Sequence, residues 1–329
     1  MATYKGIQGY TVQKLSSDPT ASEAEGQLWY NSSTGKFKIG VAAAGAWASG
    51  TSMNTAHNAT AGAGTTTAGL QAGGYDGPGS QTLNSETWNG SAWTETNNMI
   101  GLRGAMGMTG TTTAAITAGG NTTGGSYVSL SETWDGTSWS EGNNLLTARR
   151  TNMCVVGTTT AAITFSGWNG SNLDLNEEYN GTCWSEENDL NTARRVPGSA
   201  GNSTAALCIG GYTTGVVSQV ESWNGTSWTE TSTDINVAKM GVNGKGTQTA
   251  TMIAGGETTT QVAQTELFDG STWTEVADMA VVAYSVGASG GTNSGMLACG
   301  GSEGPPQAPT DLVEEWNDPV YTIKTVTVS

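Results

Sequence analysis

Short apolar runs alternate with polar, glycine-rich stretches along most of the chain. Residues 113–120, TAAITAGG, form an apolar run that ends in two glycines. Residues 131–141, SETWDGTSWSE, place two tryptophans five residues apart around Asp-Gly. Runs of this length bounded by Gly, Thr, Asn and Asp are typical of β-strands separated by turns. We therefore expect strands at 113–120, 131–134 and 137–141, preceded by a weaker strand within 104–110.

This four-strand unit recurs six times. Each copy has an aromatic residue that is followed five residues later by a second one. The first aromatics are Trp88, Trp134, Tyr179, Trp223, Phe268 and Trp316, and the second are Trp93, Trp139, Trp184, Trp228, Trp273 and Tyr321. Successive first aromatics are 46, 45, 44, 45 and 48 residues apart. A period of this length indicates a repeat architecture in which each unit buries its face against its neighbours.

Asn-Gly or Asp-Gly lies between the third and fourth predicted strands of five copies. These pairs are Asn89-Gly90, Asp135-Gly136, Asn180-Gly181, Asn224-Gly225 and Asp269-Gly270. Such a pair between two strands is typical of a two-residue type I′ hairpin, in which both central residues have positive φ. We therefore expect Thr137 opposite Trp134, with Trp134 and Trp139 as diagonal neighbours on one face of the sheet.

A single copy cannot bury its own aromatic face. An aromatic side chain buries roughly 150–250 Å², and a small four-stranded sheet achieves this only by stacking against other copies. A ring of sheets also removes open edges, so we expect an all-β, six-bladed β-propeller. The strand around Trp47, 46 residues before Trp93, is expected to lie beside Trp316 and to complete the sixth blade. A seven-bladed ring that uses residues 28–49 as a partial blade is the alternative.

The repeat resembles the kelch repeat of β-propellers. Residues 113–120 correspond to its apolar strand ending in Gly-Gly, Trp134 and Trp139 to its aromatic pair, and residues 145–150, LLTARR, to its link into the next copy. The resemblance covers about 53–321 and departs from kelch in the five-residue aromatic spacing, which is usually longer there. It implies a β-propeller and leaves the function open, because kelch propellers serve many functions.

Residues 1–27 lie outside the repeat period, and we assign residues 28–329 to the propeller. The stretch 28–40, LWYNSSTGKFKIG, resembles a segment common in bacteriophage tail and virion appendage proteins, and the opening residues resemble attachment segments of marine phages. This resemblance implies a non-enzymatic virion protein that contacts other virion proteins through residues 1–27. Its propeller is then displayed for adsorption to a host-surface glycan or for decoration of the particle. Such a protein is oligomeric in the particle, is assembled in the bacterial cytoplasm and is released by lysis.

Charge and composition argue against several kinds of partner. The chain has 28 Asp and Glu against 12 Lys and Arg, a formal net charge of −16. Such a surface repels phosphate backbones and anionic bilayers, so we expect neither nucleic-acid binding nor membrane insertion. Residues 1–27 lack the apolar core of a signal peptide. The four cysteines lack metal-binding spacing, so we expect mostly buried, reduced thiols and no metal or other cofactor.

The sequence shows no catalytic constellation. Copper chemistry of the galactose-oxidase type requires two histidines, and His57 is the single histidine of the chain. The stretch SETWDGTSW resembles the Asp box of sialidases, but Gly136 directly follows Asp135 where the Asp box has an intervening residue. A glycan hydrolase or lyase that degrades capsule or lipopolysaccharide is the alternative function. It would need carboxylates that converge on one pocket.

Cationic residues collect at one repeat position, ten residues after the second aromatic or one step later. They are His57, Arg103, Arg149, Arg150, Arg194, Arg195 and Lys239. In a propeller this position leads into the innermost strand, near the mouth of the central channel. One interpretation is a basic ring that attracts an anionic ligand such as a surface glycan. The other is that these groups bond carbonyls and carboxylates where blades meet.

Variable loops between the second and third strands should share that face. Tyr75, Trp168 and Tyr212 directly follow the glycine pair or its equivalent, and Tyr127 lies further along its loop. Variable loops on a repeated framework are where recognition usually occurs. We therefore include these four aromatics in a predicted ligand-binding site, with packing between blade edges as the alternative.

Overall fold

The computed structural model shows an all-β fold, with no helix among the residues that it describes. It describes residues 12–20, 26–42, 44–77, 79–151, 154–285, 287–303, 308–317 and 321–327. None of these described residues belongs to a helix long and apolar enough to cross a membrane. The chain divides into a smaller unit, Met1–Gly45 with Asp318–Ser329, and a larger unit, Ala46–Asn317.

The larger unit contains six four-stranded antiparallel sheets with one common topology. Five of them, each from inner to outer strand, are β5 (Ala61–Gly64), β6 (Gly69–Ala72), β9 (Ser85–Trp88), β10 (Trp93–Thr96); β11 (Gly107–Gly110), β12 (Ala115–Ala118), β13 (Ser131–Trp134), β14 (Trp139–Glu141); β15 (Val155–Thr158), β16 (Ala161–Phe165), β17 (Asn176–Tyr179), β18 (Trp184–Glu187); β19 (Gly198–Asn202), β20 (Ala205–Ile209), β21 (Val220–Trp223), β22 (Trp228–Glu230); and β23 (Asn243–Thr247), β24 (Ala250–Ala254), β25 (Thr265–Phe268), β26 (Trp273–Val276). The sixth is β27 (Gly287–Thr292), β28 (Gly295–Cys299), β31 (Val313–Asn317) and β4 (Ala46–Ser49). Two short ribbons, β7 (Tyr75–Gly77) with β8 (Ser80–Gln81) and β29 (Ser302–Glu303) with β30 (Ala308–Pro309), lie in loops between second and third strands.

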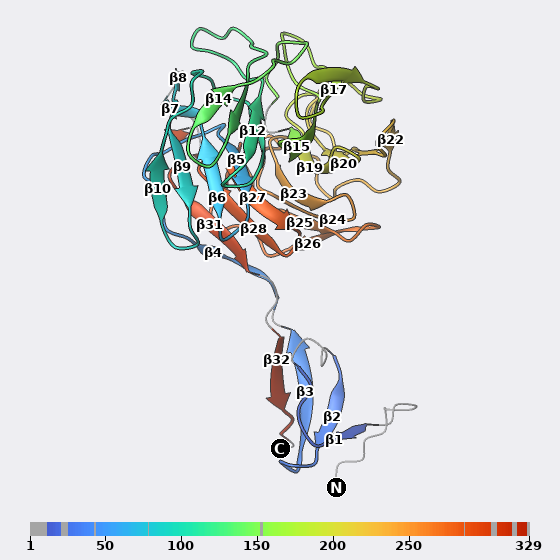
Figure 1. The fold of residues 1–329 in the computed structure, drawn as a ribbon. Coiled ribbons are helices and arrows are strands. Elements are labelled where there is room, and N and C mark those ends of the chain that lie inside the picture. The colour runs from blue at the N-terminus through green and yellow to red at the C-terminus, as the bar shows by residue number, and fades with distance from the viewer. Residues whose placement is uncertain are drawn as a thin grey trace. The chain divides into compact units, whose positions relative to one another are not determined.

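The inner strands of consecutive sheets lie next to one another, which gives a propeller-like arrangement (Figure 1). Strand β5 contacts β11, and the series continues through β15, β19 and β23 to β27, which also contacts β5. Each inner strand has a glycine at positive φ among its last three residues, such as Gly110 at +122°. A Cβ there would lie 2.2 Å from the carbonyl oxygen of Ala114, so the turn into the second strand requires glycine.

The hairpin between the third and fourth strands differs from the predicted type I′ turn. Trp134 lies directly opposite Trp139, and the loop has four residues, closed by a bond from the Asp135 N–H to the Ser138 carbonyl (3.2 Å). Gly136 has φ +94°, whereas Asp135 does not have a positive φ. The Asp135 carboxylate accepts the backbone N–H groups of Thr137 and Ser138 at 2.8 and 2.7 Å. Asp or Asn is therefore needed here because its side chain accepts hydrogen bonds from the loop backbone, and not because its own backbone is left-handed.

The paired aromatics fill the spaces between sheets. In all six sheets the ring centroids of the pair lie 4.8–5.7 Å apart. Trp134 and Trp139 pack in one cluster with Leu70 of the preceding sheet and Met108 of their own. The Trp139 indole N–H also donates to the Ser85 hydroxyl on β9 of that preceding sheet (3.1 Å). Sheet-to-sheet packing of these indoles forms the core, as the repeat predicts.

The two ends of the repeat region meet in the sixth sheet. Strand β4 pairs with β31, with Trp47 opposite Trp316, as the spacing predicts. Trp47 therefore takes the place that the period had assigned to Tyr321, which lies in the smaller unit. The chain passes between the units at Ala46 and Asn317, which are paired with each other. This passage occupies the position of the Asn-Gly or Asp-Gly loop in the other sheets.

The smaller unit is one four-stranded sheet of β1 (Gln13–Leu15), β2 (Leu28–Asn31), β3 (Lys36–Ala42) and β32 (Tyr321–Thr325). The predicted boundary at residue 28 is therefore wrong, and residues 28–42 do not form a partial seventh blade. The physical reason is that β3 pairs with β32 along five residues, which the forty-five-residue period does not reveal. Most of residues 1–27, the predicted attachment segment, lies outside the described residues.

Candidate functional site

Five of the predicted cationic site residues lie buried beside repeated glutamates, four of them as ion pairs and His57 with its imidazole near the carboxylate. Each glutamate is the second residue of a third strand, and each cation lies in the link that leads into the same sheet. The pairs are His57–Glu86 (3.9 Å), Arg103–Glu132 (3.2 Å), Arg149–Glu177 (2.6 Å), Arg194–Glu221 (2.5 Å) and Lys239–Glu266 (3.1 Å). All ten side chains are at most 4% exposed. We call each such arrangement a clamp.

The carboxylate of a clamp also fixes the backbone of the link. Glu132 accepts the N–H groups of Ile100 and Gly101 at 2.9 and 3.0 Å. Glu86 accepts those of Asn54 and Thr55 in the same way, both at 2.9 Å. Carboxylates that are this buried require partners of this kind, because an unpaired buried charge costs several kcal/mol. The clamps therefore join each link to the sheet that it enters.

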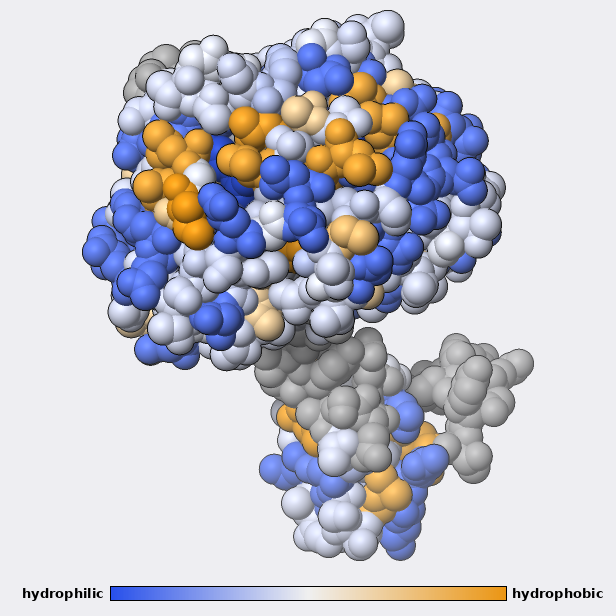
Figure 2. All heavy atoms as spheres, turned by 45° about the horizontal axis from the view of Figure 1, so that its top comes forward, coloured by the Kyte–Doolittle hydropathy of each residue, from blue (hydrophilic) through white to orange (hydrophobic). Residues whose placement is uncertain are grey.

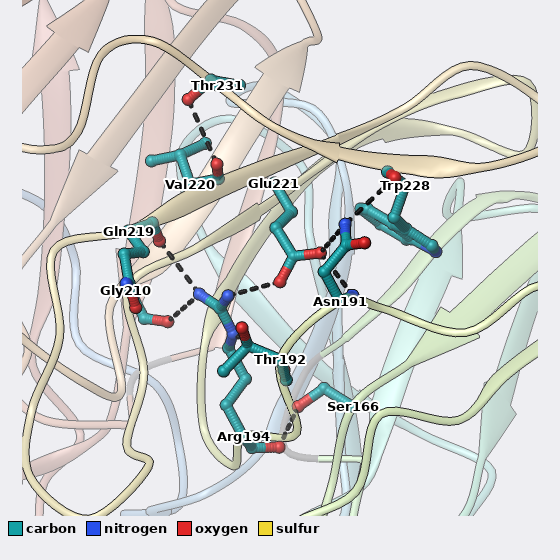
Figure 3. A network of polar contacts seen from close by, with 10 residues as sticks. All are labelled: Ser166, Asn191, Thr192, Arg194, Gly210, Gln219, Val220, Glu221, Trp228 and Thr231. Carbon is teal, nitrogen blue, oxygen red and sulfur yellow. Dashed lines mark hydrogen bonds and ion pairs between the residues drawn. The ribbon is translucent and has the colours of Figure 1, made fainter.

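The fourth sheet shows the clamp in full (Figure 3). The Arg194 guanidinium donates to the Glu221 carboxylate and to the carbonyls of Gly210 and Gln219, the latter two at 3.1 and 3.0 Å. Glu221 also accepts the backbone N–H and the side-chain amide of Asn191 at 2.7 and 2.9 Å. Every charged group drawn in this network thus has several partners.

The prediction of an exposed basic ring is wrong for His57, Arg103, Arg149, Arg194 and Lys239. The charges of the three arginines and Lys239 are buried and matched by carboxylates, and the buried His57 imidazole lies beside Glu86, which is the alternative that the sequence left open. Burial lowers the pKa of Arg103 to about 10, and Glu132 opposes that shift. Burial also lowers the pKa of His57, whose Nδ1 lies 3.0 Å from the Gly73 carbonyl oxygen. His57 is therefore neutral at neutral pH, and its clamp is the one without a permanent cation among these five.

The cationic residues one step later, Arg150 and Arg195, are only half-buried and lie among aromatic rings. The Arg195 guanidinium lies 4.7 Å from the ring centroid of Trp168 and 4.1 Å from that of Tyr212. Arg150 lies 5.8 Å from the Tyr127 ring, and the Trp168 indole N–H donates to the Tyr127 hydroxyl at 2.8 Å. These five residues come from three neighbouring sheets and form what we call the Arg–aromatic cluster.

Short backbone bridges hold this cluster in place. Arg150 bridges Trp168, and Arg195 bridges Tyr212, each through paired N–H and carbonyl groups. The sequence thus correctly grouped the arginines with these aromatics, but Tyr75 is separate. Its hydroxyl donates to the Asn121 side chain at 2.7 Å.

Two further residues near the cluster were not found from the sequence. Burial and Glu257 raise the pKa of Tyr284 to about 12, while Arg195 and Arg150 act to lower it. Glu257 and the two arginines therefore all lie within electrostatic range of Tyr284. The signal available in the sequence was position alone, since Tyr284 is the equivalent of Arg195 in the sixth copy, and Glu257 is the equivalent of Tyr212 in the fifth.

A cavity of about 270 Å³ lies between the inner strands. Each of the six inner strands contributes to its wall, for example through Ala63, Thr109, Val156, Ala200, Lys245 and Gly290. The Lys245 ammonium donates to the Gly62 carbonyl at 3.3 Å, and burial lowers its pKa to about 8. No pattern in the sequence distinguishes this lysine from the others.

Apolar residues are scattered among polar ones on the surface of the larger unit (Figure 2). The most exposed large ones lie in the links between sheets, with Leu146 62% and Ile100 51% exposed. Both follow a buried residue of the link, Leu145 or Met99.

No family model matches the chain, and no curated protein matches it at a significant level.

Proposed function

We infer that the larger unit is a closed, six-bladed, kelch-like β-propeller. The succession of inner strands from β5 to β27 and back to β5 supports closure. A series of backbone hydrogen bonds runs the same way, from Ala105 N–H to the Ala59 carbonyl, Ala59 to Ser285, Ser285 to Gly241 and Gly241 to Val196. Their N···O distances are 3.2, 3.1, 3.3 and 2.8 Å. In a closed ring, equivalent residues of successive sheets form hydrogen bonds with one another in this way.

We propose that the protein is a non-enzymatic phage virion protein that displays this propeller. The observation that carries the proposal is the division into two units, in which residues 28–40, the phage-like stretch, fold apart from the repeats. They form the β2–β3 hairpin of the smaller unit. The smaller unit then serves for attachment to other virion proteins, together with residues 1–27. The larger one serves for adsorption to the host surface or for decoration of the particle.

The ligand of the displayed face is an anionic host-surface glycan. Arg150 and Arg195 are two half-buried guanidinium groups in a chain of net charge −16, and both are held by aromatic rings. Guanidinium groups bind carboxylate and phosphate groups through paired hydrogen bonds. The rings of Trp168 and Tyr212 add apolar surface of the kind that packs on sugars. The cluster therefore offers both charge and stacking contacts to an acidic sugar.

The clamps support a binding function over the enzymatic alternative. Acid–base catalysis on glycans requires two carboxylates that can exchange protons at the substrate. Glu132, Glu177 and Glu221 are buried and bound to backbone N–H groups and arginines. They have a structural role, and a hydrolase or lyase would depend on other carboxylates such as Glu257.

Particle composition tests the virion assignment. Purified phage particles carrying the gene for this chain should contain the protein when they are analysed by mass spectrometry, at many copies per particle. A control protein of the same lysate that is not part of the particle should be depleted. Depletion of this chain to the same extent would overturn the assignment.

Polysaccharide binding tests the ligand. The chain should bind alginate, a polyanionic uronic-acid polymer, and not dextran, a neutral one, and Arg195→Ala should weaken alginate binding at least about fivefold. Lys36→Ala, an exposed charge in the smaller unit, is the matched control and should leave binding unchanged. Equal loss with both variants would contradict the assignment of the site, and release of reducing ends would favour the enzyme.

A further inference from the structure

The sixth sheet has the glutamate of a clamp but not the cation. Glu314 is the second residue of β31, as Glu266 is of β25, and Ala283 occupies the position of Lys239 in the preceding sheet. Glu314 is 4% exposed, and it accepts the backbone N–H groups of Ala280 and Val281 at 2.8 and 3.1 Å. Among the described residues, no basic side chain lies within ion-pair distance of Glu314, whereas four of the other glutamates pair with an arginine or a lysine and Glu86 has His57 at 3.9 Å.

A small pocket lies where the cation of the sixth clamp would be. It is lined by Met279, Ala283, Gly300, Thr310, Leu312 and Glu314, among others. Its accessible space is about 10 Å³, which is roughly the space that one water molecule requires. Because Ala283 stands where the other sheets have a lysine or arginine, room remains beside a buried carboxylate for one ion or molecule of about the size of water.

The fifth clamp shows which atoms would surround an ion in this pocket. There the Lys239 ammonium lies 3.1 Å from Glu266 Oε1 and 3.4 Å from the Gln264 carbonyl oxygen. In the sixth sheet, Leu312 takes the place of Gln264, since the Gly300 N–H donates to its carbonyl as the Gly255 N–H does to that of Gln264. The sixth pocket therefore offers a carboxylate and a carbonyl oxygen in the arrangement that binds an ammonium group one sheet earlier.

We propose that this pocket binds a free monovalent cation of the size of ammonium, either ammonium itself or potassium. A single carboxylate beside a neutral carbonyl oxygen matches one positive charge, whereas calcium sites contain several charged or carbonyl oxygen ligands. A buried carboxylate is stabilised by an adjacent cation. Ammonium and potassium are close to a water molecule in size, and a guanidinium ion is too large for the pocket. This site is independent of the glycan-binding proposal.

Thermal unfolding at constant ionic strength tests the site. We expect the Tm of the full chain to be about 2–4 °C higher in 100 mM ammonium or potassium chloride than in tetramethylammonium chloride. Tetramethylammonium has the same charge and does not fit the pocket. Comparison of the ammonium and potassium curves identifies the preferred ion. Equal Tm values in all three salts would overturn the proposal.

Two variants locate the effect. Ala283→Lys supplies an ammonium group from the chain, and Glu314→Gln removes the charge that holds the ion, so each should abolish the difference between the salts. Lys239→Ala is the matched control, because it recreates the sixth arrangement in the fifth sheet and should enlarge the difference. If Ala283→Lys does not fold, the salt dependence of the Tm of Glu314→Gln still tests the site. A salt difference that persists in Glu314→Gln shows that the ion binds elsewhere and refutes the assignment.

Discussion

Arg194 and Arg195 are adjacent in sequence and have opposite surroundings. Arg194 is 1% exposed and is held by Glu221 and two carbonyls, while Arg195 is half-buried between the rings of Trp168 and Tyr212. The first belongs to the repeated clamps and the second to the Arg–aromatic cluster. Their difference teaches that, within this repeat, one position builds the framework and the next is available for recognition.

Arg194→Ala should produce the largest effect on stability. Removal of the guanidinium leaves Glu221 buried without its cation, which costs about 3–5 kcal/mol of unfolding free energy. Urea unfolding followed by tryptophan fluorescence measures the change. A loss below about 1 kcal/mol would show that the clamp does not stabilise the framework.

Lys245→Met should stabilise the protein at pH 7, because no carboxylate among the described residues forms an ion pair with Lys245 as Glu266 does with Lys239. The pKa of Lys245 is lowered from 10.5 to about 8, which corresponds to about 3 kcal/mol of destabilisation while the group is charged. Below pH 8 the lysine is protonated in both folded and unfolded chains, so the full cost is present. Between pH 8 and 10.5 the unfolded chain binds more protons, so the stability of the natural protein rises with pH relative to the variant.

Urea unfolding of both proteins at pH 7, 9 and 10.5 checks this sign. The advantage of Lys245→Met should shrink as the pH rises. An advantage that grows with pH, or a methionine variant that is less stable at pH 7, would contradict the cost assigned to this partly buried ammonium.

Gly136→Val should destabilise the framework by about 1–3 kcal/mol, because a β-branched residue is strained at φ +94°. Thr137→Val, in the same exposed loop, is the matched control and should change the unfolding free energy by less than about 0.5 kcal/mol. Thermal or urea unfolding distinguishes the two. Similar small effects at both positions would show that the loop tolerates another backbone conformation.

Arg195→Ala should have the smallest effect on stability. A cation–π contact at a partly exposed site contributes about 0.5–1 kcal/mol, so the unfolding free energy should fall by no more than that while alginate binding weakens. A loss as large as that of Arg194→Ala would remove the distinction between framework and recognition site. It would also assign the cluster to packing between blades.

The sequence correctly predicts the six copies, the strands within them and the pairing of the Trp47 and Trp316 strands. These features repeat at a fixed period, and each is local, because apolar runs, turn glycines and paired aromatics determine short strands wherever they occur. The hairpin register was missed because the same Asp-Gly pair fits two turns. The Asp135 carboxylate, which binds two backbone N–H groups, decides for the four-residue loop.

The roles of the cations could be determined only from the tertiary structure. Arg149 meets Glu177 and Arg194 meets Glu221 across 27 or 28 residues of chain, and only the folded sheet brings these carboxylates to the links. The glutamate that recurs in SETW and its equivalents is the signal of this pairing that the sequence contains.

The sequence by itself determined that this protein is built from repeated small β-sheets, because the pattern of strands and turns is set by residues close to one another. The tertiary structure alone decided which charges are buried and which remain available, and that residues 28–42 form a separate sheet with β32. The physical reason is that the cost of burying a charge, and the partner of a strand, depend on groups that folding brings together from distant positions.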